Sequence, residues 1–151
     1  MTSWTDFAAA APELAHRIRQ CFAIRKHATL ATLRRDGSPR ISGTEVSFTD
    51  DGLYLGMMPG SRKALDLRRD PRLALHCPTE DPPEDDPGSW LGDAKIAGRA
   101  TQMSDQTSGD EAHRFMIDVF EVVHTCVGTP ADHLVIESWH PDRGLQRRAR
   151  R

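Results

Sequence analysis

The sequence predicts a mainly β, α+β fold: a six-stranded antiparallel closed or split β-barrel, with N-terminal, central and C-terminal helices. Three observations lead to this prediction. Short segments that alternate aliphatic with small or polar residues recur along the chain. The turns between the first three segments are too short for a parallel crossover. Apolar residues three or four positions apart, and two capped starts, indicate the helices.

Residues 1–26 are predicted to contain an amphipathic helix. Apolar residues recur there at helical spacing and fall on one face: Phe7, Ala11, Leu14, Ile18 and Phe22. Only Pro12 interrupts this stripe. No basic stretch precedes an apolar core, and the chain has no run of about 18 apolar residues, so we expect a cytoplasmic protein that does not enter a membrane.

The strands are predicted where apolar residues alternate with polar ones. Their ranges are 27–34, 41–48, 53–58, 72–77, 94–103 and 133–139. Asp51 and Gly52 suit a tight hairpin between the second and the third. Residues 78–89 are rich in proline and carboxylates and are predicted to form an exposed loop. The order of strands and turns favours a single domain over residues 1–151.

A C-terminal helix is predicted from the capping-box pattern of Ser108 and Glu111. The apolar residues expected on one face of this helix are Ala112, Phe115, Val119 and Val122. Residues 143–151 are predicted to form a solvated basic tail. With a net charge of −2 and no aromatic residues between the terminal arginines, the tail is a poor nucleic-acid site, and we expect no nucleic-acid partner.

The segment "PGSRKALDLRRDPR" (59–72) concentrates basic residues at a predicted helix start. Ser61 is a good N-cap, and a helix start offers unpaired N–H groups with a partial positive charge. The hydroxyl of Ser61, the guanidinium of Arg62 and the ammonium of Lys63 could bind a phosphate together. Gly60 leaves room for a ligand to approach the backbone. The alternative is that these side chains are merely solvated.

Metal and disulfide chemistry have little support in the sequence. Cys21, Cys77 and Cys126 are odd in number and form no CxxC pair, which argues against a disulfide framework and a zinc ribbon. The seven histidines lack any tight ligand spacing. We therefore predict no metal site.

The chain resembles the pyridoxamine 5′-phosphate oxidase-like family of flavin-binding split barrels over about residues 24–103. The resemblance rests on an ordered series of segments: "ATLATLRRDGSPRIS", "DDGLYLGMMPGSRKALDLRRDPRLALHCP" and "AKIAGRATQM". It implies a homodimeric barrel with FMN in each of two grooves at the interface, and a small-molecule substrate. A deazaflavin coenzyme also carries a phosphate and a hydride position, so it remains an alternative cofactor.

The resemblance also assigns residues to the cofactor. Ser61, Arg62 and Lys63 match the segment that contacts the phosphate. Residues 41–46 match the strand that lies along the flavin ring, and four of them are candidates for contact: Ile41, Ser42, Thr44 and Val46. Gly56 and Met57 match a strand end beside the ribityl chain. Asp93 stands where the family commonly has an amide.

The expected function is that of a flavoprotein oxidoreductase in which the cofactor carries the hydride. We assign no catalytic acid, base or nucleophile, and expect Tyr54 to be a packing residue. The C-terminal region lacks the family's Arg-Leu-His type of segment, so oxidation of pyridoxamine phosphate itself is not expected. A deazaflavin-dependent reductase and a non-catalytic module that binds flavin or tetrapyrrole are the alternatives. Trp139, His140 and Arg143 could cover a partner's cofactor groove, although packing and solvation explain them more simply.

Overall fold

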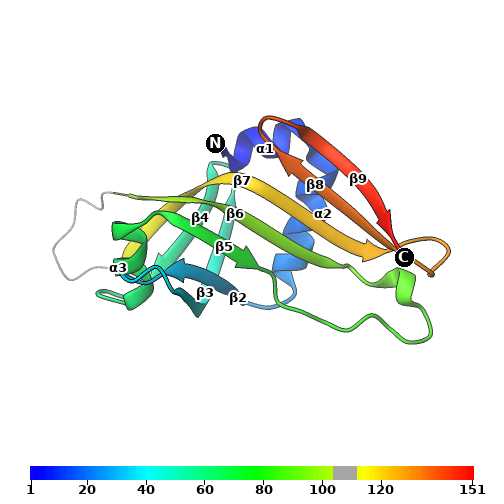
Figure 1. The fold of residues 1–151 in the computed structure, drawn as a ribbon, viewed down its shortest axis with the longest axis horizontal. Coiled ribbons are helices and arrows are strands. Elements are labelled where there is room, and N and C mark those ends of the chain that lie inside the picture. The colour runs from blue at the N-terminus through cyan, green and yellow to red at the C-terminus, as the bar shows by residue number, and fades with distance from the viewer. Residues whose placement is uncertain (104–111) are drawn as a thin grey trace.

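The computed structural model describes residues 1–103 and 112–151. It consists largely of antiparallel strands, with three α-helices among the described residues (Figure 1). The elements are β1 (Thr2–Ser3), α1 (Trp4–Ala10), α2 (Pro12–Ala23), β2 (His27–Leu33), β3 (Pro39–Thr49), β4 (Gly52–Met57), α3 (Arg62–Arg69), β5 (Arg72–His76), the 3-10 turn η1 (Pro87–Ser89), β6 (Asp93–Gln102), β7 (His113–Val127), β8 (Leu134–His140) and β9 (Gly144–Arg150).

Six strands close into a barrel. Their order is β4-β3-β2-β5-β6-β7, and β4 also pairs with β7 to complete the ring. All of these pairings are antiparallel. The predicted fold class, a six-stranded antiparallel barrel, is confirmed, but its sixth strand is β7; the predicted strand at 133–139 corresponds to β8, which pairs with β7 and β9 outside this ring.

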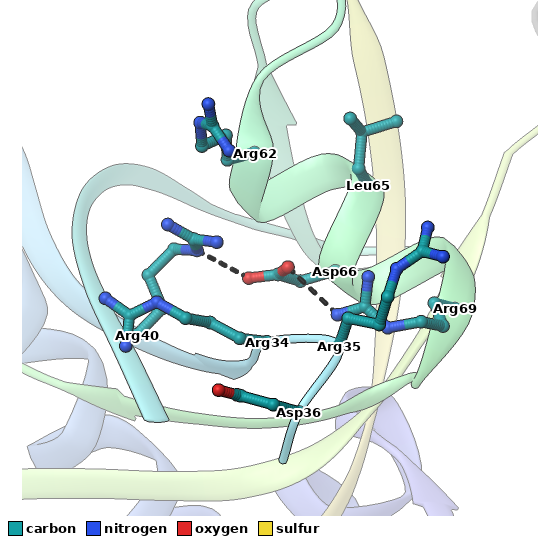
Figure 2. A pocket seen from close by; sticks show the side chains of 8 residues that line it. All are labelled: Arg34, Arg35, Asp36, Arg40, Arg62, Leu65, Asp66 and Arg69. Carbon is teal, nitrogen blue, oxygen red and sulfur yellow. Dashed lines mark hydrogen bonds and ion pairs between the residues drawn. The ribbon is translucent and has the colours of Figure 1, made fainter. Parts of the chain in front are cut away.

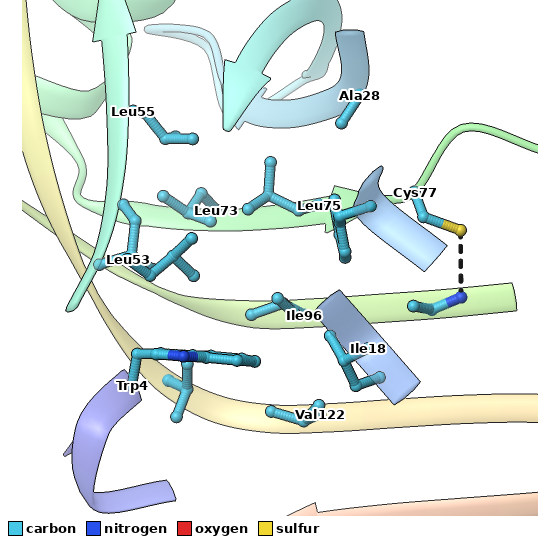
Figure 3. Close-up of a cluster of buried hydrophobic side chains, with 14 of the residues drawn as sticks. Trp4, Ile18, Ala28, Leu53, Leu55, Leu73, Leu75, Cys77, Ile96 and Val122 are labelled. Carbon is cyan, nitrogen blue, oxygen red and sulfur yellow. Dashed lines mark hydrogen bonds between the residues drawn. The ribbon is translucent and has the colours of Figure 1, made fainter. Parts of the chain in front are cut away.

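The barrel interior is filled by aliphatic side chains from facing strands. Leu53 and Leu55 of β4 meet Leu73 and Leu75 of β5 there (Figure 3), and each of the four is at most 6% exposed. Successive strand residues point to opposite faces, so these leucines, two positions apart on each strand, point to the same face and form the core. The barrel therefore provides a rigid support for groups on its outer surface and at its ends.

The N-terminal region forms two helices. α1 ends at Ala10, and Pro12 occupies the first turn of α2, where its missing N–H costs nothing. The predicted apolar stripe is confirmed, since all five of its members are buried: Phe7, Ala11, Leu14, Ile18 and Phe22. Trp4 and Ile18 reach the interior cluster of the barrel (Figure 3).

The predicted C-terminal helix is wrong for the residues that the structure describes. Residues 113–127 form strand β7, whereas Ser108 and Glu111 lie outside the described residues. Phe115 and Val119 point inward with the period of two that a strand requires, but a bulge opposite Ala97 and Gly98 then shifts the inward phase by one residue. Val122 is inward after the shift. The bulge thus gives the inward apolar residues of this strand the spacing that is expected of a helix.

The basic tail is also corrected. Residues 144–150 form β9, which pairs with β8 along its whole length. β9 begins directly after the turn at Gly144, whose φ of +67° is a conformation that favours glycine. Within the two described ranges, none of the helices combines the length and the apolar character that a membrane crossing requires.

Candidate cofactor-binding site

Helix α3 begins where the sequence predicts it to begin. The Ser61 hydroxyl accepts a hydrogen bond from the backbone N–H of Ala64 at 3.4 Å, so Ser61 is the N-cap. Gly60 has φ +67° and allows the chain to turn from β4 into the helix, and its N–H donates to His113 Nε2 at 3.1 Å. Proline 71 follows the end of α3, which agrees with the expected stop.

Arg62 and Lys63 leave the helix start in different directions. Lys63 Nζ donates to the backbone carbonyl of Gly43 on β3 at 2.6 Å. Arg62 instead lines a separate groove with Arg40 and Asp66 (Figure 2). The predicted phosphate segment therefore places one cation on each side of the first turn of α3.

The side of Lys63 borders a large groove of about 1260 Å³. It runs between the end of α2, strands β3 and β4, and the start of β7. Five of the predicted cofactor residues line it together: Thr44, Val46, Gly56, Met57 and Lys63. The other four do not line this groove: Ile41, Ser42, Ser61 and Arg62.

Strand β3 presents two different faces over residues 41–46. Thr44 is 2% exposed, and its Oγ1 atom is buried without a hydrogen-bond partner. Ile41 is 75% exposed on the opposite face. A buried hydroxyl without a partner costs about 1–3 kcal/mol, so an unpaired Oγ1 beside a groove indicates a place for a polar ligand atom.

Bare backbone borders the same groove. A Cβ atom added to Gly43 or Gly56 would meet no atom within 4 Å, so both glycines face open space. A ligand can therefore approach the peptide groups of β3 and β4 closely.

Several groove residues were not predicted from the sequence. They come from the end of α2, the following segment and the start of β2, and from β4 and β7: Phe22, Lys26, His27, Tyr54, His113 and Arg114. Tyr54 is 9% exposed and Arg114 stacks over its ring at 4.3 Å, so the prediction that Tyr54 packs is confirmed. No local motif joins these residues, because distant parts of the chain bring them together; the pairing of β4 with β7, for example, brings His113 and Arg114 beside Tyr54.

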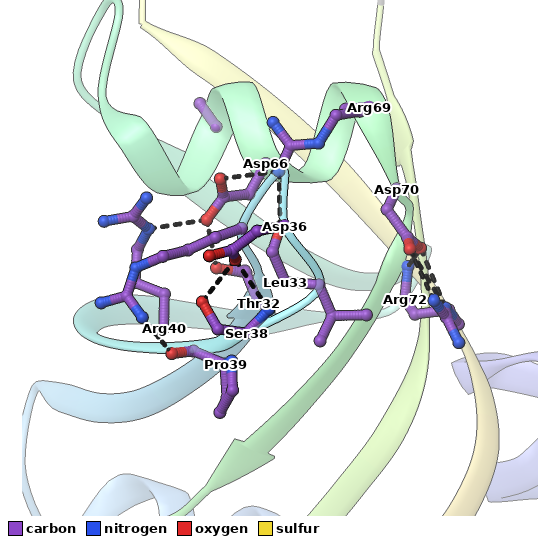
Figure 4. A network of polar contacts seen from close by, with 12 residues as sticks. Thr32, Leu33, Asp36, Ser38, Pro39, Arg40, Asp66, Arg69, Asp70 and Arg72 are labelled. Atoms are coloured by element: carbon purple, nitrogen blue, oxygen red, sulfur yellow. Dashed lines mark hydrogen bonds and ion pairs between the residues drawn. The ribbon is translucent and has the colours of Figure 1, made fainter.

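The side of Arg62 is built around a buried carboxylate. Asp66, 3% exposed, accepts hydrogen bonds from Thr32 Oγ1 at 2.8 Å, Arg40 Nε at 2.7 Å and an Arg69 terminal nitrogen at 3.0 Å (Figure 4). Burial raises the pKa of Asp66, but the bonds from Arg40, Thr32 and Arg69 outweigh it and hold the pKa below its ordinary value. This charged network fixes α3 against β2 and β3.

The C-terminal residues are mostly structural. Trp139 is 7% exposed and its ring packs against Phe7 with 5.0 Å between centroids, so it is part of the core. His140 Nε2 lies 2.7 Å from a carboxylate oxygen of Glu121. Arg143 is exposed in the turn before β9. The simpler explanation holds for Trp139, whose indole faces its own barrel.

Comparisons with known proteins agree with this architecture. The family profile described as pyridoxamine 5′-phosphate oxidase matches residues 14–143. No curated protein matches the chain. Among solved structures, a pyridoxamine 5′-phosphate oxidase-related, FMN-binding protein from Nostoc punctiforme is similar, with TM-score 0.64, 13% identity, and coverage of 96% of this chain and 97% of that one.

Two further structures show how varied such barrels are. PhzG from Burkholderia lata, solved with tetrahydrophenazine-1-carboxylic acid, has TM-score 0.64 and 12% identity over 95% of this chain and 91% of that one. The heme storage protein HutZ from Vibrio cholerae has TM-score 0.54 and 15% identity over 73% and 89% of the two chains. At these identities the structures show the fold alone. With the profile covering most of its length, the chain belongs to the pyridoxamine 5′-phosphate oxidase family.

Proposed function

We propose that the protein binds FMN, or a related flavin such as a deazaflavin coenzyme, and acts as an oxidoreductase. The observation that carries this proposal is the large groove in which the unpartnered hydroxyl of Thr44 and the ammonium of Lys63 lie on the same wall. A flavin needs a cation for its phosphate and polar partners for its ring, and this groove offers both. The name of the Nostoc relative, which includes FMN binding, supports the same ligand.

The chain's own residues fit the phosphate end of such a ligand. Lys63 donates only to a carbonyl, and no carboxylate within the described residues forms an ion pair with it or with Arg62. Their charges are therefore available to an anion. With the helix start that Ser61 caps, Lys63 would hold a phosphate in the large groove, while Arg62 faces the separate groove on the other side of the first turn of α3.

The remaining predicted residues fit the ring and the ribityl chain. Thr44 would donate its hydroxyl to a polar edge of the ring, while Val46 and the bare backbone at Gly43 border it. Gly56 and Met57 would lie beside the ribityl chain. A bound flavin supplies the hydride chemistry, and the protein binds it, orients it and limits its contact with water.

A homodimer with the cofactor between two barrels is part of this proposal. Ile41, Ala31, Ala74 and Ala97 are in register across four neighbouring strands, on the outer face of the barrel. Small side chains make this face flat, and the 75% exposed side chain of Ile41 adds apolar surface at its edge. A flat, partly apolar sheet face supports packing against a second copy. Ile41 would then contact the partner or its cofactor.

The test is a flavin titration of the purified protein, followed by absorbance and fluorescence. Lys63→Ala should weaken FMN binding about 10- to 100-fold, since a charge-assisted hydrogen bond contributes about 1.5–3 kcal/mol. Lys95→Ala, an exposed lysine on β6 outside this groove, is the matched control and should change nothing. Thr44→Val should weaken flavin binding while making the ligand-free protein slightly more stable, because it removes an unpaired buried hydroxyl.

Three outcomes would contradict parts of the proposal. Protein that takes up neither FMN nor a deazaflavin does not bind flavins. Light scattering that gives the mass of one 16.8 kDa chain excludes a groove shared between copies. A bound flavin that is not turned over with any electron donor and acceptor favours a non-catalytic binding module.

A further inference from the structure

A second groove, of about 490 Å³, lies on the Arg62 side of α3 and is dominated by arginine. Figure 2 shows the residues that line it: Arg34, Arg35, Asp36, Arg40, Arg62, Leu65, Asp66 and Arg69. Five arginines face two aspartates in a protein whose net charge is −2. The arginines come from the β2–β3 turn, the start of β3 and helix α3, so the fold and not a single charged run collects them.

Two of the arginines already have a structural partner. Arg40 and Arg69 both form ion pairs with the buried carboxylate of Asp66, at 2.7 and 3.0 Å. Arg69 also donates to the carbonyl of Leu33 at 2.6 Å. These contacts hold the walls of the groove, so Arg40 and Arg69 are not free to leave for a ligand.

Three arginines remain without a carboxylate. In the described part of the chain, Arg34, Arg35 and Arg62 take part in none of the ion pairs. Asp36 forms no ion pair with them: its carboxylate accepts from the backbone N–H and hydroxyl of Ser38 at 3.0 and 2.6 Å, and its charge offsets only one of the five guanidinium charges. The groove therefore keeps about three uncompensated positive charges on walls that the Asp66 network fixes.

A lone phosphate does not need this many cations. At neutral pH a phosphate monoester carries at most about two negative charges. On the side of the large groove, Lys63 and the helix start that Ser61 caps would hold one phosphate, whereas Arg62 faces the second groove. Arg34 and Arg35 lie past Arg62, on the flank that faces away from the large groove. Guanidinium groups bind phosphate oxygens in a bidentate manner, so this flank suits further phosphate.

We propose that the Arg34–Arg35–Arg62 groove binds a second phosphate, so that the preferred ligand carries a diphosphate, as a dinucleotide does, instead of a single phosphate. This inference rests on the proposed flavin site, which it extends beyond the first turn of α3. Arg35 is the specificity-determining residue, since it belongs to the groove and makes no other hydrogen bond or ion pair in the described residues. The exposed side chain of Leu65, 48% accessible, offers an apolar surface beside the charges.

The experiment is isothermal titration of the full chain with three ligands, FMN, FAD and inorganic pyrophosphate, and with orthophosphate as the reference anion. We expect FAD to bind at least about tenfold more tightly than FMN, and pyrophosphate to bind more tightly than orthophosphate. Arg35→Ala should weaken FAD and pyrophosphate about tenfold while FMN changes less than twofold. Arg68→Ala, an exposed arginine of α3 outside the groove, is the control and should change none of them.

The titrations with flavins and with pyrophosphate distinguish the proposed flavin function from the proposed diphosphate groove. If neither flavin binds but pyrophosphate binds in an Arg35-dependent manner, the proposed flavin function is wrong and the diphosphate groove stands. Equal affinity for FAD and FMN, together with pyrophosphate binding that is no tighter than that of orthophosphate, overturns the groove. So does an Arg35→Ala protein that binds all three ligands as the wild type does.

Discussion

The protein has two arginine-rich regions, and they differ in how their arginines are held. Around α3, Arg40 and Arg69 contact a carboxylate that is 3% exposed. Along β9, the arginines project from an exposed strand, and those at 147, 148 and 150 form no ion pair among the described residues. Both regions border a groove, the second of about 740 Å³. The two regions thus hold similar numbers of arginines, but only the α3 region has a buried carboxylate, that of Asp66, which pairs with some of them.

The difference indicates separate roles for the two regions. Arg40 and Arg69, held by Asp66, fix the walls of the α3 groove, so these walls need not become ordered when a ligand binds to the unpaired arginines beside them. The arginines of β9 stand on a strand whose outer edge is unpaired within the described sheet. Charged side chains on an edge strand disfavour pairing with a strand of another molecule. The α3 region is therefore built to bind, whereas the charges of β9 protect an edge.

The largest expected effect comes from removing the buried carboxylate of Asp66. Asp66→Asn should lower the free energy of unfolding by about 3 kcal/mol, because it leaves Arg40 and Arg69 without their buried counter-charge. Urea denaturation of the two proteins measures this difference. Glu121→Gln, which weakens the contact between the partly exposed Glu121 and the buried His140, should cost less than about 1 kcal/mol. Equal losses in both variants would remove the distinction between the regions.

Low pH should remove the negative charge of Asp66 without a mutation. The pKa of Asp66 is lower in the folded protein than its ordinary value of about 3.9, so below about pH 4 the unfolded chain binds the proton more readily. Stability from Asp66 is therefore present above this pH and is lost as the pH falls through the folded pKa. The stability difference between wild type and Asp66→Asn should shrink from pH 5 downward in urea titrations. A difference that stays constant down to pH 2 would contradict the role of the ionised carboxylate.

Local signals were enough to predict much of the fold and the start of the site. Ser61 caps α3 because a hydroxyl at a helix start is a property of a few neighbouring residues. Local signals did not predict that Arg62 and Lys63 would line different grooves. Successive helical residues point about 100° apart, and which neighbour each one meets depends on β3, twenty residues earlier.

The features that the sequence analysis predicted wrongly or missed also depend on residues far away in the chain. The bulge that shifts Val122 inward depends on the partner strand at Ala97 and Gly98, so the spacing of β7 alone resembles a helix. Strand β9 is exposed along almost its whole length and lacks the alternation of apolar and polar residues that marks a strand, so only its pairing with β8 makes it one. Asp66 gives no sign in the sequence that it is buried, because Thr32 and Arg40 reach it from two other strands. Long-range pairing determined each of these features.

The smallest expected effect tests the other region. Arg148→Ala combined with Arg150→Ala removes two exposed guanidinium groups from β9, so the free energy of unfolding should change by less than about 0.5 kcal/mol. Binding of FMN, FAD and pyrophosphate should stay within twofold of wild type, measured by the same titrations. What should change is self-association at high protein concentration, which light scattering detects, because the edge of β9 loses its charged protection. A tenfold loss of pyrophosphate affinity in this variant would instead place a second anion site on the hairpin, and anchoring by a buried carboxylate would no longer separate binding arginines from protective ones.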